Sequence, residues 1–106
     1  VTENMNPDQF EKGIESSDVV ILDVRTPEEY AEGHIAGALN INYYDDNFQS
    51  QVEAKVSKDK TVYVYCKAGG RSAKSCKMMA GAGYKSLVNL ESGFDGWADA
   101  GKKVEK

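Results

Sequence analysis

The segment Tyr-Cys-Lys-Ala-Gly-Gly-Arg-Ser, residues 65–72, carries the residue types in this chain that are best suited to chemistry. Cys66 ends a strongly apolar run, and Lys67, two glycines, Arg71 and a serine come after it. A cysteine thiolate is a strong nucleophile, and it forms most readily where cations or unpaired backbone N–H groups surround the sulfur. The segment therefore predicts a nucleophilic cysteine at position 66.

The loop after Cys66 has to lead from a predicted strand into a predicted helix. Gly69 and Gly70 permit positive φ angles and leave the backbone bare, so that successive N–H groups can converge on one point. The first turn of the helix adds unpaired N–H groups and the positive end of the helix dipole. Together with the charges of Lys67 and Arg71, these groups predict a partly exposed thiolate and a cradle for an oxyanion such as thiosulfate, sulfite or phosphate.

Two other interpretations of Cys66 start from the same residues. Free cysteines are often small apolar core residues, but the glycines and cations around Cys66 argue against that role here. A cysteine-dependent phosphatase has a loop one residue longer than the four residues between Cys66 and Arg71, and it commonly has a histidine where this chain has Tyr65. The shorter loop favours a group the size of one sulfur atom, as in a persulfide.

Apolar and amphipathic runs alternate along the chain, which is typical of strands connected by helices. Strands are predicted at residues 18–24, 38–42, 61–66 and 86–90, and helices after Asn6, after Thr26, at 47–56, at 71–82 and around 94–98. The alternation predicts a parallel sheet with crossover helices, which is an α/β fold. Ligands of such sheets bind at the carboxyl ends of the strands, where Cys66 is predicted to lie.

Two of the predicted helices begin with the same capping pattern. Asn6 and Thr26 are each followed by a proline at the first helical position and by Gln9 or Glu29 at the third, and Gly33 is predicted to end the second helix. Apolar stripes predict the buried faces of three helices, namely Phe10 and Ile14, then Phe48, Val52 and Val56, then Ala73, Cys76 and Ala80.

The 106 residues fit one domain, 1–106, with an ordered core at about 4–101 and a polar tail, 101–106, that we expect to fray. The formal net charge of −4 argues against nucleic acid as a partner. No apolar run approaches the ~18 residues that cross a membrane, and two cysteines without paired spacing predict neither a disulfide scaffold nor a zinc site.

We expect a cytoplasmic monomer. Because Val1 rather than Met comes first, the alternative is a periplasmic or exported protein that has lost an upstream segment.

Four motifs resemble, in order and spacing, those of single-domain rhodaneses, which are sulfurtransferases. They are Asp-Val-Arg at 23–25, Gly-His-Ile-Ala-Gly-Ala at 33–38, Cys-Lys-Ala-Gly-Gly-Arg at 66–71 and Gly-Phe-Asp-Gly-Trp at 93–97. The resemblance extends over residues 4–101. It implies a rhodanese-like three-layer α/β/α fold with a five-stranded parallel sheet in the order 3-2-4-5-1, and a short first strand near residues 3–5 that composition alone does not predict.

By this resemblance, Cys66 is the catalytic residue. It attacks the outer sulfur of thiosulfate or of a persulfide donor, and the resulting persulfide passes its sulfur to cyanide or to a thiol, including a thiol on a partner protein. The implied substrate-binding residues are Lys67, Ala68, Gly69, Gly70, Arg71 and Arg25. No metal or organic cofactor is implied. The alternatives are a sulfur-relay or binding module without turnover of its own and, on the same fold, a phosphatase or arsenate reductase.

Three further residues have both a chemical and a structural interpretation. Arg25 either faces the substrate or forms an ion pair with Asp23 or Glu29, and the two interpretations are equally supported. His34, the only histidine, is expected to hydrogen-bond the backbone of a turn rather than to act as a base. Cys76 is expected to be buried on its helix, because a bridge to the nucleophile across two helical turns is geometrically difficult.

Aromatic residues flank the predicted site. Phe94 and Trp97 have helical spacing and are expected in the core, although they could also line a substrate mouth. Tyr43 and Tyr44 follow a predicted strand and form either the rim of the site or an ordinary solvated loop. The acidic pair at residues 45–46 would repel a bare anion, which disfavours a small oxyanion as the physiological donor.

Overall fold

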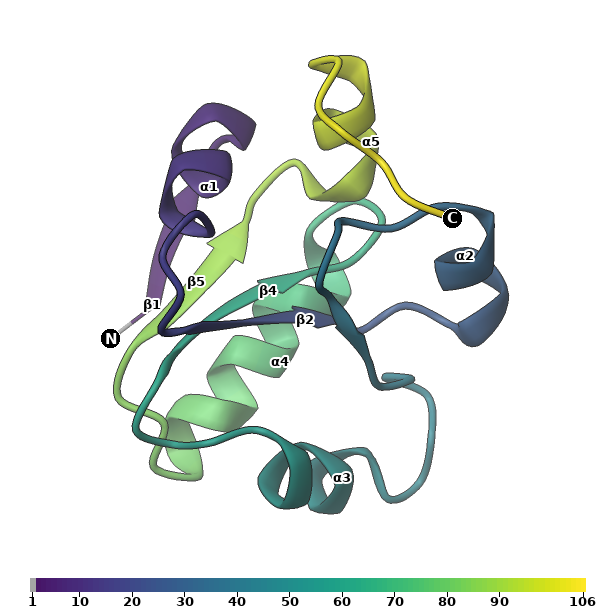
Figure 1. The fold of residues 1–106 in the computed structure, drawn as a ribbon. Helices are drawn as coiled ribbons and strands as arrows, with labels where there is room; N and C mark the ends of the chain where they lie inside the picture. The colour runs from purple at the N-terminus through teal and green to yellow at the C-terminus, as the bar shows by residue number, and fades with distance from the viewer. Residues whose placement is uncertain (1) are drawn as a thin grey trace.

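The computed structural model describes residues 2–106 and contains one sheet of five parallel strands (Figure 1). The strands are β1 (Thr2–Met5), β2 (Val19–Asp23), β3 (Leu39–Asn40), β4 (Thr61–Tyr65) and β5 (Leu87–Leu90). Their order, β1-β5-β4-β2-β3, is the implied order 3-2-4-5-1 counted from the other edge. β4 therefore lies in the middle of the sheet, and the α/β fold is confirmed.

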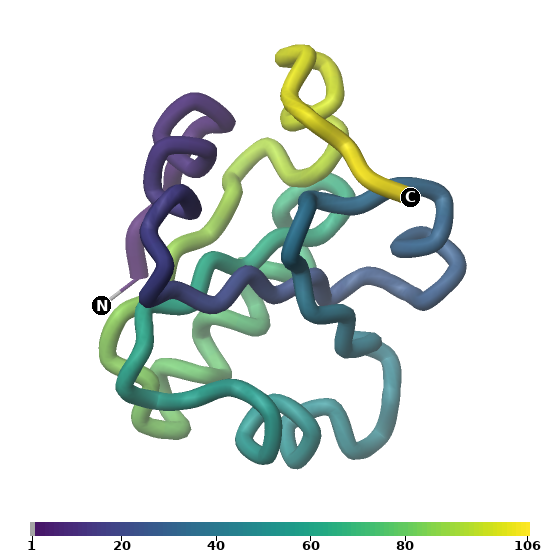
Figure 2. Tube along the Cα trace, viewed as in Figure 1, coloured from purple at the N-terminus to yellow at the C-terminus, as the bar shows by residue number. Residues whose placement is uncertain are grey.

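Helices cover both faces of the sheet, giving three layers (Figures 1 and 2). They are α1 (Pro7–Gly13), α2 (Pro27–Glu32), α3 (Phe48–Lys55), α4 (Gly70–Gly81) and α5 (Gly93–Asp99). One apolar cluster joins the sheet to α3 and α4, and a second joins its other face to α1, α2 and α5. None of the helices in residues 2–106 is long and apolar enough to cross a membrane.

The first two helices begin as their capping signals predict. The Asn6 side chain accepts a hydrogen bond from the Gln9 amide, and the Gln9 side chain accepts one from the Asn6 amide. Thr26 and Glu29 form the same reciprocal pair at the start of α2, and Gly33 ends that helix. These caps depend on residues three apart in sequence, so local pattern is sufficient to predict them.

The buried face of α3 is as predicted, but that of α4 is not. Ala73 and Ala80 are exposed, and the buried residues of α4 are Ser72, Ser75, Cys76 and Met79. The serines tolerate burial because their hydroxyls are hydrogen-bonded: Ser75 donates to the Arg71 carbonyl and Ser72 to the Gly69 carbonyl. Because the prediction considered apolar residues alone, it placed the first and last buried positions of α4 at Ala73 and Ala80, each one residue after the buried Ser72 and Met79.

The C-terminal tail is attached to the domain. The backbones of His34 and Glu105 exchange two N–H···O hydrogen bonds of 2.8 Å, and the indole N–H of Trp97 donates to the Lys103 carbonyl. Figure 2 shows the yellow end of the chain reaching the blue segment at the end of α2. The tail thus has partners in the domain that its polar composition does not reveal, and the expectation that it frays stays a prediction.

Candidate active site

Cys66 directly follows β4, at the carboxyl end of the central strand. Its carbonyl accepts a hydrogen bond of 2.7 Å from the Phe94 amide, and the next carbonyl, of Lys67, accepts one from the Asp95 amide. The first turn of α5 thus holds the start of the loop in place. The position at a strand end is the one that the sequence predicts for the nucleophile.

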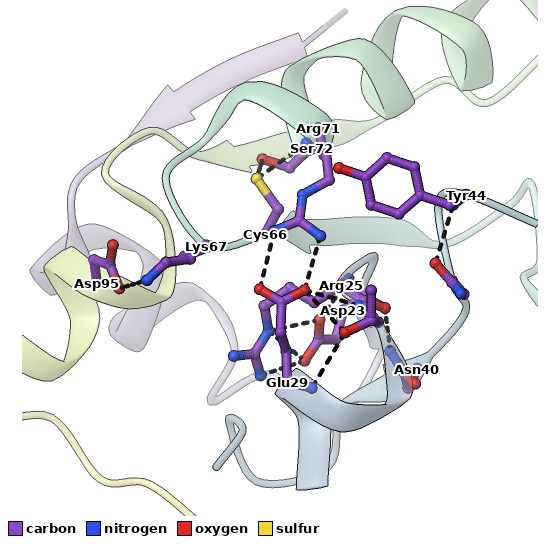
Figure 3. Close-up of polar contacts among 12 residues, drawn as sticks. Asp23, Arg25, Glu29, Asn40, Tyr44, Cys66, Lys67, Arg71, Ser72 and Asp95 are labelled. Atoms are coloured by element: carbon purple, nitrogen blue, oxygen red, sulfur yellow. Dashed lines mark hydrogen bonds and ion pairs between the residues drawn. The ribbon is translucent and has the colours of Figure 1, made fainter. Parts of the chain in front are cut away.

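Three hydrogen-bonding groups converge on the Cys66 sulfur, and Figure 3 shows the two that belong to Ser72. The amides of Gly69 and Ser72 donate to Sγ at 3.1 and 3.3 Å, and the Ser72 Oγ lies 3.3 Å from it. Ser72 Oγ also donates to the Gly69 carbonyl at 3.1 Å. The two amides favour negative charge on the sulfur. Ser72 was missed by the sequence prediction, although a serine immediately after Arg71 in a helical first turn is a local signal.

The sulfur is enclosed rather than partly exposed as predicted, since Cys66 is only 1% exposed. The loop closes around it because its amides turn inward. Lys67, Ala68 and Gly70 are the exposed residues of the loop. The amides of Gly70 and Arg71 open α4 and have no acceptor within the helix, so they remain available to a group bound beyond the sulfur.

Two glycines give the loop its path. Gly69 has a φ of +98°, and a Cβ there would collide with the Glu91 carbonyl oxygen. Gly93 has a φ of +67°, and a Cβ there would collide with the Lys67 carbonyl. Gly70, by contrast, has no positive φ, and a Cβ there would have no neighbour within 4 Å. The prediction that both loop glycines supply special backbone is therefore correct only for Gly69.

Each of the two loop cations is paired with a carboxylate that the sequence did not suggest. Arg71 forms a two-pronged ion pair with Glu29, with Nη1–Oε1 and Nη2–Oε2 distances of 2.9 and 3.1 Å. The hydrogen bonds from Arg71 lower the pKa of Glu29 to about 2. Lys67 Nζ lies 3.4 Å from Asp95 Oδ1 at the surface. The predicted cations do lie at the loop, but neither acts as an isolated charge.

Arg25 forms the ion pair that was one of its two interpretations. Its guanidinium donates to both carboxylate oxygens of Asp23 and, at 2.7 Å, to the Gly33 carbonyl. It is 4% exposed, and its Cζ lies 4.3 Å from the centre of the Phe94 ring. Asp23, not Glu29, is the partner, so Arg25 ties the end of β2 to the end of α2.

A pocket of about 280 Å³ opens beside the loop. Its lining mixes both charges with one aromatic ring: Arg25, Glu29, Glu32, Gly33, Lys67, Phe94 and Asp95. The Cys66 sulfur is not part of this lining, so the pocket adjoins the nucleophile rather than containing it. Phe94 serves both the core and the pocket, whereas the core prediction holds fully for Trp97, which is 2% exposed.

The remaining candidate residues have structural surroundings. His34 Nδ1 lies 3.0 Å from the Tyr30 carbonyl and its ring stacks on Tyr30, which confirms a structural histidine. Cys76 is buried, and its thiol points toward the Val88 carbonyl at 3.9 Å. Both cysteines are free.

Tyr44 is exposed and lies against Arg71, with the guanidinium carbon 5.6 Å from its ring centre, so it belongs to the rim of the site.

Residues 6–100 match the family described as the Rhodanese-like domain. This chain belongs to the rhodanese-like family. The match extends over nearly the whole of the sheet and its helices, and it includes all four motifs recognised in the sequence.

Known relatives agree with this membership. Thiosulfate sulfurtransferase 16, chloroplastic, of Arabidopsis thaliana is 34% identical over 89 residues, covering 76% of this chain and 74% of that protein. Protein HIGH ARSENIC CONTENT 1, mitochondrial, of the same plant is 38% identical over 104 residues, and the aligned part of the chain spans only 62% of its length. The crystal structure of a rhodanese-like domain protein from Staphylococcus aureus is 31% identical and superimposes with a TM-score of 0.80, covering 98% of this chain and 99% of that one. The rhodanese-like family to which this chain belongs thus includes a relative named as a thiosulfate sulfurtransferase.

Proposed function

We propose that this rhodanese-like protein transfers a sulfane sulfur through a persulfide on Cys66. The donor is thiosulfate or a persulfide, and the acceptor is a thiophile such as cyanide or a thiol. The observation that carries the proposal is the convergence of two backbone amides, those of Gly69 and Ser72, on one sulfur atom. Groups that stabilise a thiolate there also activate it as a nucleophile.

The transfer is a double displacement without net oxidation. In the first half, the Cys66 thiolate attacks the outer sulfur of thiosulfate, an S–S bond forms, and the bond to the sulfonate sulfur breaks with its electron pair leaving as sulfite. In the second half, cyanide or a thiolate attacks the outer sulfur of the persulfide, and the electron pair of the broken S–S bond returns to Cys66. Neither half consumes a metal, a cofactor or a separate oxidant.

The loop supplies the binding groups in this proposal. The amides of Lys67, Ala68, Gly70 and Arg71 are close in sequence to the sulfur and hold the outer sulfur or the oxygens of the donor, in the manner of an oxyanion hole. Gly69 and Ser72 hold the inner sulfur. Arg25 acts from the adjacent pocket, where it keeps the end of α2 and the Phe94 ring in position.

Intact-mass measurement tests the proposal directly. After incubation with thiosulfate, the wild-type protein should gain the mass of one sulfur atom, and cyanide should remove it with release of thiocyanate. The variant Cys66→Ser should gain nothing. Wild-type protein that never gains sulfur from thiosulfate or from a persulfide donor contradicts the proposal, whereas loading without release to small acceptors indicates a relay module.

The rival chemistries on the same fold are separated by two further assays. The loop between Cys66 and Arg71 is shorter than that of a phosphatase, and two of its amides point at the sulfur itself rather than at space beyond it. We therefore expect no hydrolysis of a generic aryl phosphate and no reduction of arsenate. Activity in either assay that Cys66→Ser removes would make that chemistry the better assignment.

A further inference from the structure

Resting on the sulfur transfer proposed above, we infer that Glu29 determines which donors load Cys66. Glu29 cancels the charge of Arg71 beside the nucleophile, so the site accepts sulfane donors that carry one negative charge in preference to dianionic thiosulfate. Glu29 is therefore a specificity-determining positioning residue, since it acts through Arg71 and not on the donor itself.

The geometry of the Glu29–Arg71 pair leaves little of the arginine for an anion. Both terminal nitrogens of the guanidinium donate to Glu29, at 2.9 and 3.1 Å, and one face of the group lies near the Tyr44 ring. Figure 3 shows the Arg71 side chain reaching past Cys66 toward Glu29. A donor at the loop would have to break this two-pronged pair to use the charge of Arg71.

Glu29 is itself held firmly in place. Its Oε1 accepts hydrogen bonds from the Thr26 amide and hydroxyl, at 3.0 and 3.1 Å, as well as from Arg71. The hydrogen bonds from Arg71, followed by those from Thr26, keep its pKa near 2, so the carboxylate stays ionised throughout the physiological range. The same side chain thus caps α2 and fixes the first cation of α4.

The other charges near the loop do not restore a positive field. Lys67 is paired with Asp95, and Arg25 is paired with Asp23. Glu32, which lines the adjacent pocket, has no ion-pair partner among residues 2–106. The three pairs are neutral and Glu32 adds one negative charge, so the surroundings of the nucleophile favour a donor with less negative charge than thiosulfate.

A matched pair of donors isolates this effect. Methanethiosulfonate has the same terminal sulfur as thiosulfate but one negative charge instead of two. Cys66 attacks that sulfur in both, and the electron pair of the broken bond leaves on methanesulfinate or on sulfite. Because the cycle is a double displacement, kcat/KM for each donor reports the loading step alone. The ratio of the two values, thiosulfate over methanethiosulfonate, therefore measures the preference for donor charge.

The variant Glu29→Gln should raise this ratio about fivefold to tenfold, because it frees the charge of Arg71 while the glutamine oxygen still accepts from Thr26. The rate with thiosulfate should also become more sensitive to ionic strength than in the wild type. Glu28→Gln is the matched control: Glu28 is exposed in the first turn of the same helix, and its loss should leave the ratio unchanged.

The variant Arg71→Gln should shift the ratio the other way, because it leaves Glu29 as an uncompensated negative charge. A ratio that stays within about twofold of wild type in Glu29→Gln, or that moves in the same direction in both variants, would overturn the inference. If Glu29→Gln does not fold, Arg71→Gln and the wild-type salt dependence decide. A wild-type rate that falls more steeply with rising salt for thiosulfate than for methanethiosulfonate indicates attraction of the dianion and also overturns the inference. Failure of both donors to add sulfur to wild-type Cys66, by intact mass, instead refutes the sulfur transfer itself.

Discussion

The two cysteines of this chain have the same burial and different surroundings. Cys66 and Cys76 are each 1% exposed, and both belong to the apolar cluster between the sheet and α3 and α4. The Cys66 sulfur accepts hydrogen bonds from two backbone amides, whereas the Cys76 thiol points toward a carbonyl oxygen, that of Val88. Burial, together with a smaller contribution from the charge at Cys66, raises the pKa of Cys76 to about 12.

The comparison shows that the polarity of the nearby backbone, not exposure, distinguishes the surroundings of the two thiols. An amide N–H stabilises a thiolate, while a carbonyl oxygen stabilises the neutral S–H group. The amides reach Cys66 because it precedes a helix, whose first N–H groups have no partners of their own. Cys76 lies within the same helix, where the N–H groups are already used, and its sulfur lies in the apolar cluster and points toward a carbonyl oxygen.

The largest expected effect comes from exchanging each sulfur for oxygen. Cys66→Ser should reduce thiosulfate:cyanide sulfurtransferase turnover to background, because a serine hydroxyl cannot form the persulfide. Cys76→Ser should retain most of the turnover per folded molecule. Steady-state thiocyanate production by both variants, at matched folded concentration, checks this. Equal losses in the two variants would remove the distinction between the cysteines.

Differential alkylation measures the same contrast in the unmodified protein. A pKa of about 12 leaves Cys76 with roughly three thousandfold less thiolate than an ordinary cysteine of pKa about 8.5. At pH 6.5, iodoacetamide should therefore label Cys66 much faster than Cys76, and labelling of Cys76 should rise about tenfold for each pH unit below its pKa. Peptide mapping of labelled native protein gives both rates. Slow and equal labelling would contradict an activated Cys66.

Substitution of the two loop glycines tests whether the amides need the observed backbone. Gly69→Ala should cost about 2 kcal/mol or more of unfolding free energy, because an alanine at positive φ is strained and its Cβ meets the Glu91 carbonyl. Sulfur loading should fall as well, since the Gly69 amide would move. Gly70→Ala, at an open position, is the matched control and should change little. Urea denaturation and intact-mass loading provide the measurements.

The smallest expected effect is that of one hydroxyl. Ser72→Ala removes the Oγ that lies 3.3 Å from the Cys66 sulfur but keeps the Ser72 amide. When the thiolate forms, the hydroxyl can turn its one proton from the Gly69 carbonyl to the sulfur, and a hydrogen bond to a charged group contributes about 1.5–3 kcal/mol, so loading should slow by about tenfold or somewhat more. Ser75→Ala, which loses a hydroxyl bonded to the Arg71 carbonyl, is the control. A loading rate for Ser72→Ala equal to that of the control would assign stabilisation of the sulfur to the amides alone.

Much of the fold was accessible from local pattern. The capping pairs of α1 and α2, the buried face of α3 and the end of β4 at Cys66 depend on residues within a few positions of one another. The stripe of α4 was misplaced because buried serines do not appear apolar. β1, with the exposed and polar sequence Thr-Glu-Asn-Met, was predicted only through the family resemblance, since its pairing with β5 supplies what its composition lacks.

The sequence by itself determined where Cys66 lies and why amides surround it, because a strand, a short glycine loop and a helix start are local features. Only the tertiary structure decided what the cations do. Glu29 and Arg71 are 42 residues apart in sequence, and Lys67 and Asp95 are 28 apart. Parallel strands with crossover helices bring such distant residues to one edge of the sheet. The choice of partner for a long charged side chain depends on that three-dimensional proximity, which no spacing along the chain encodes.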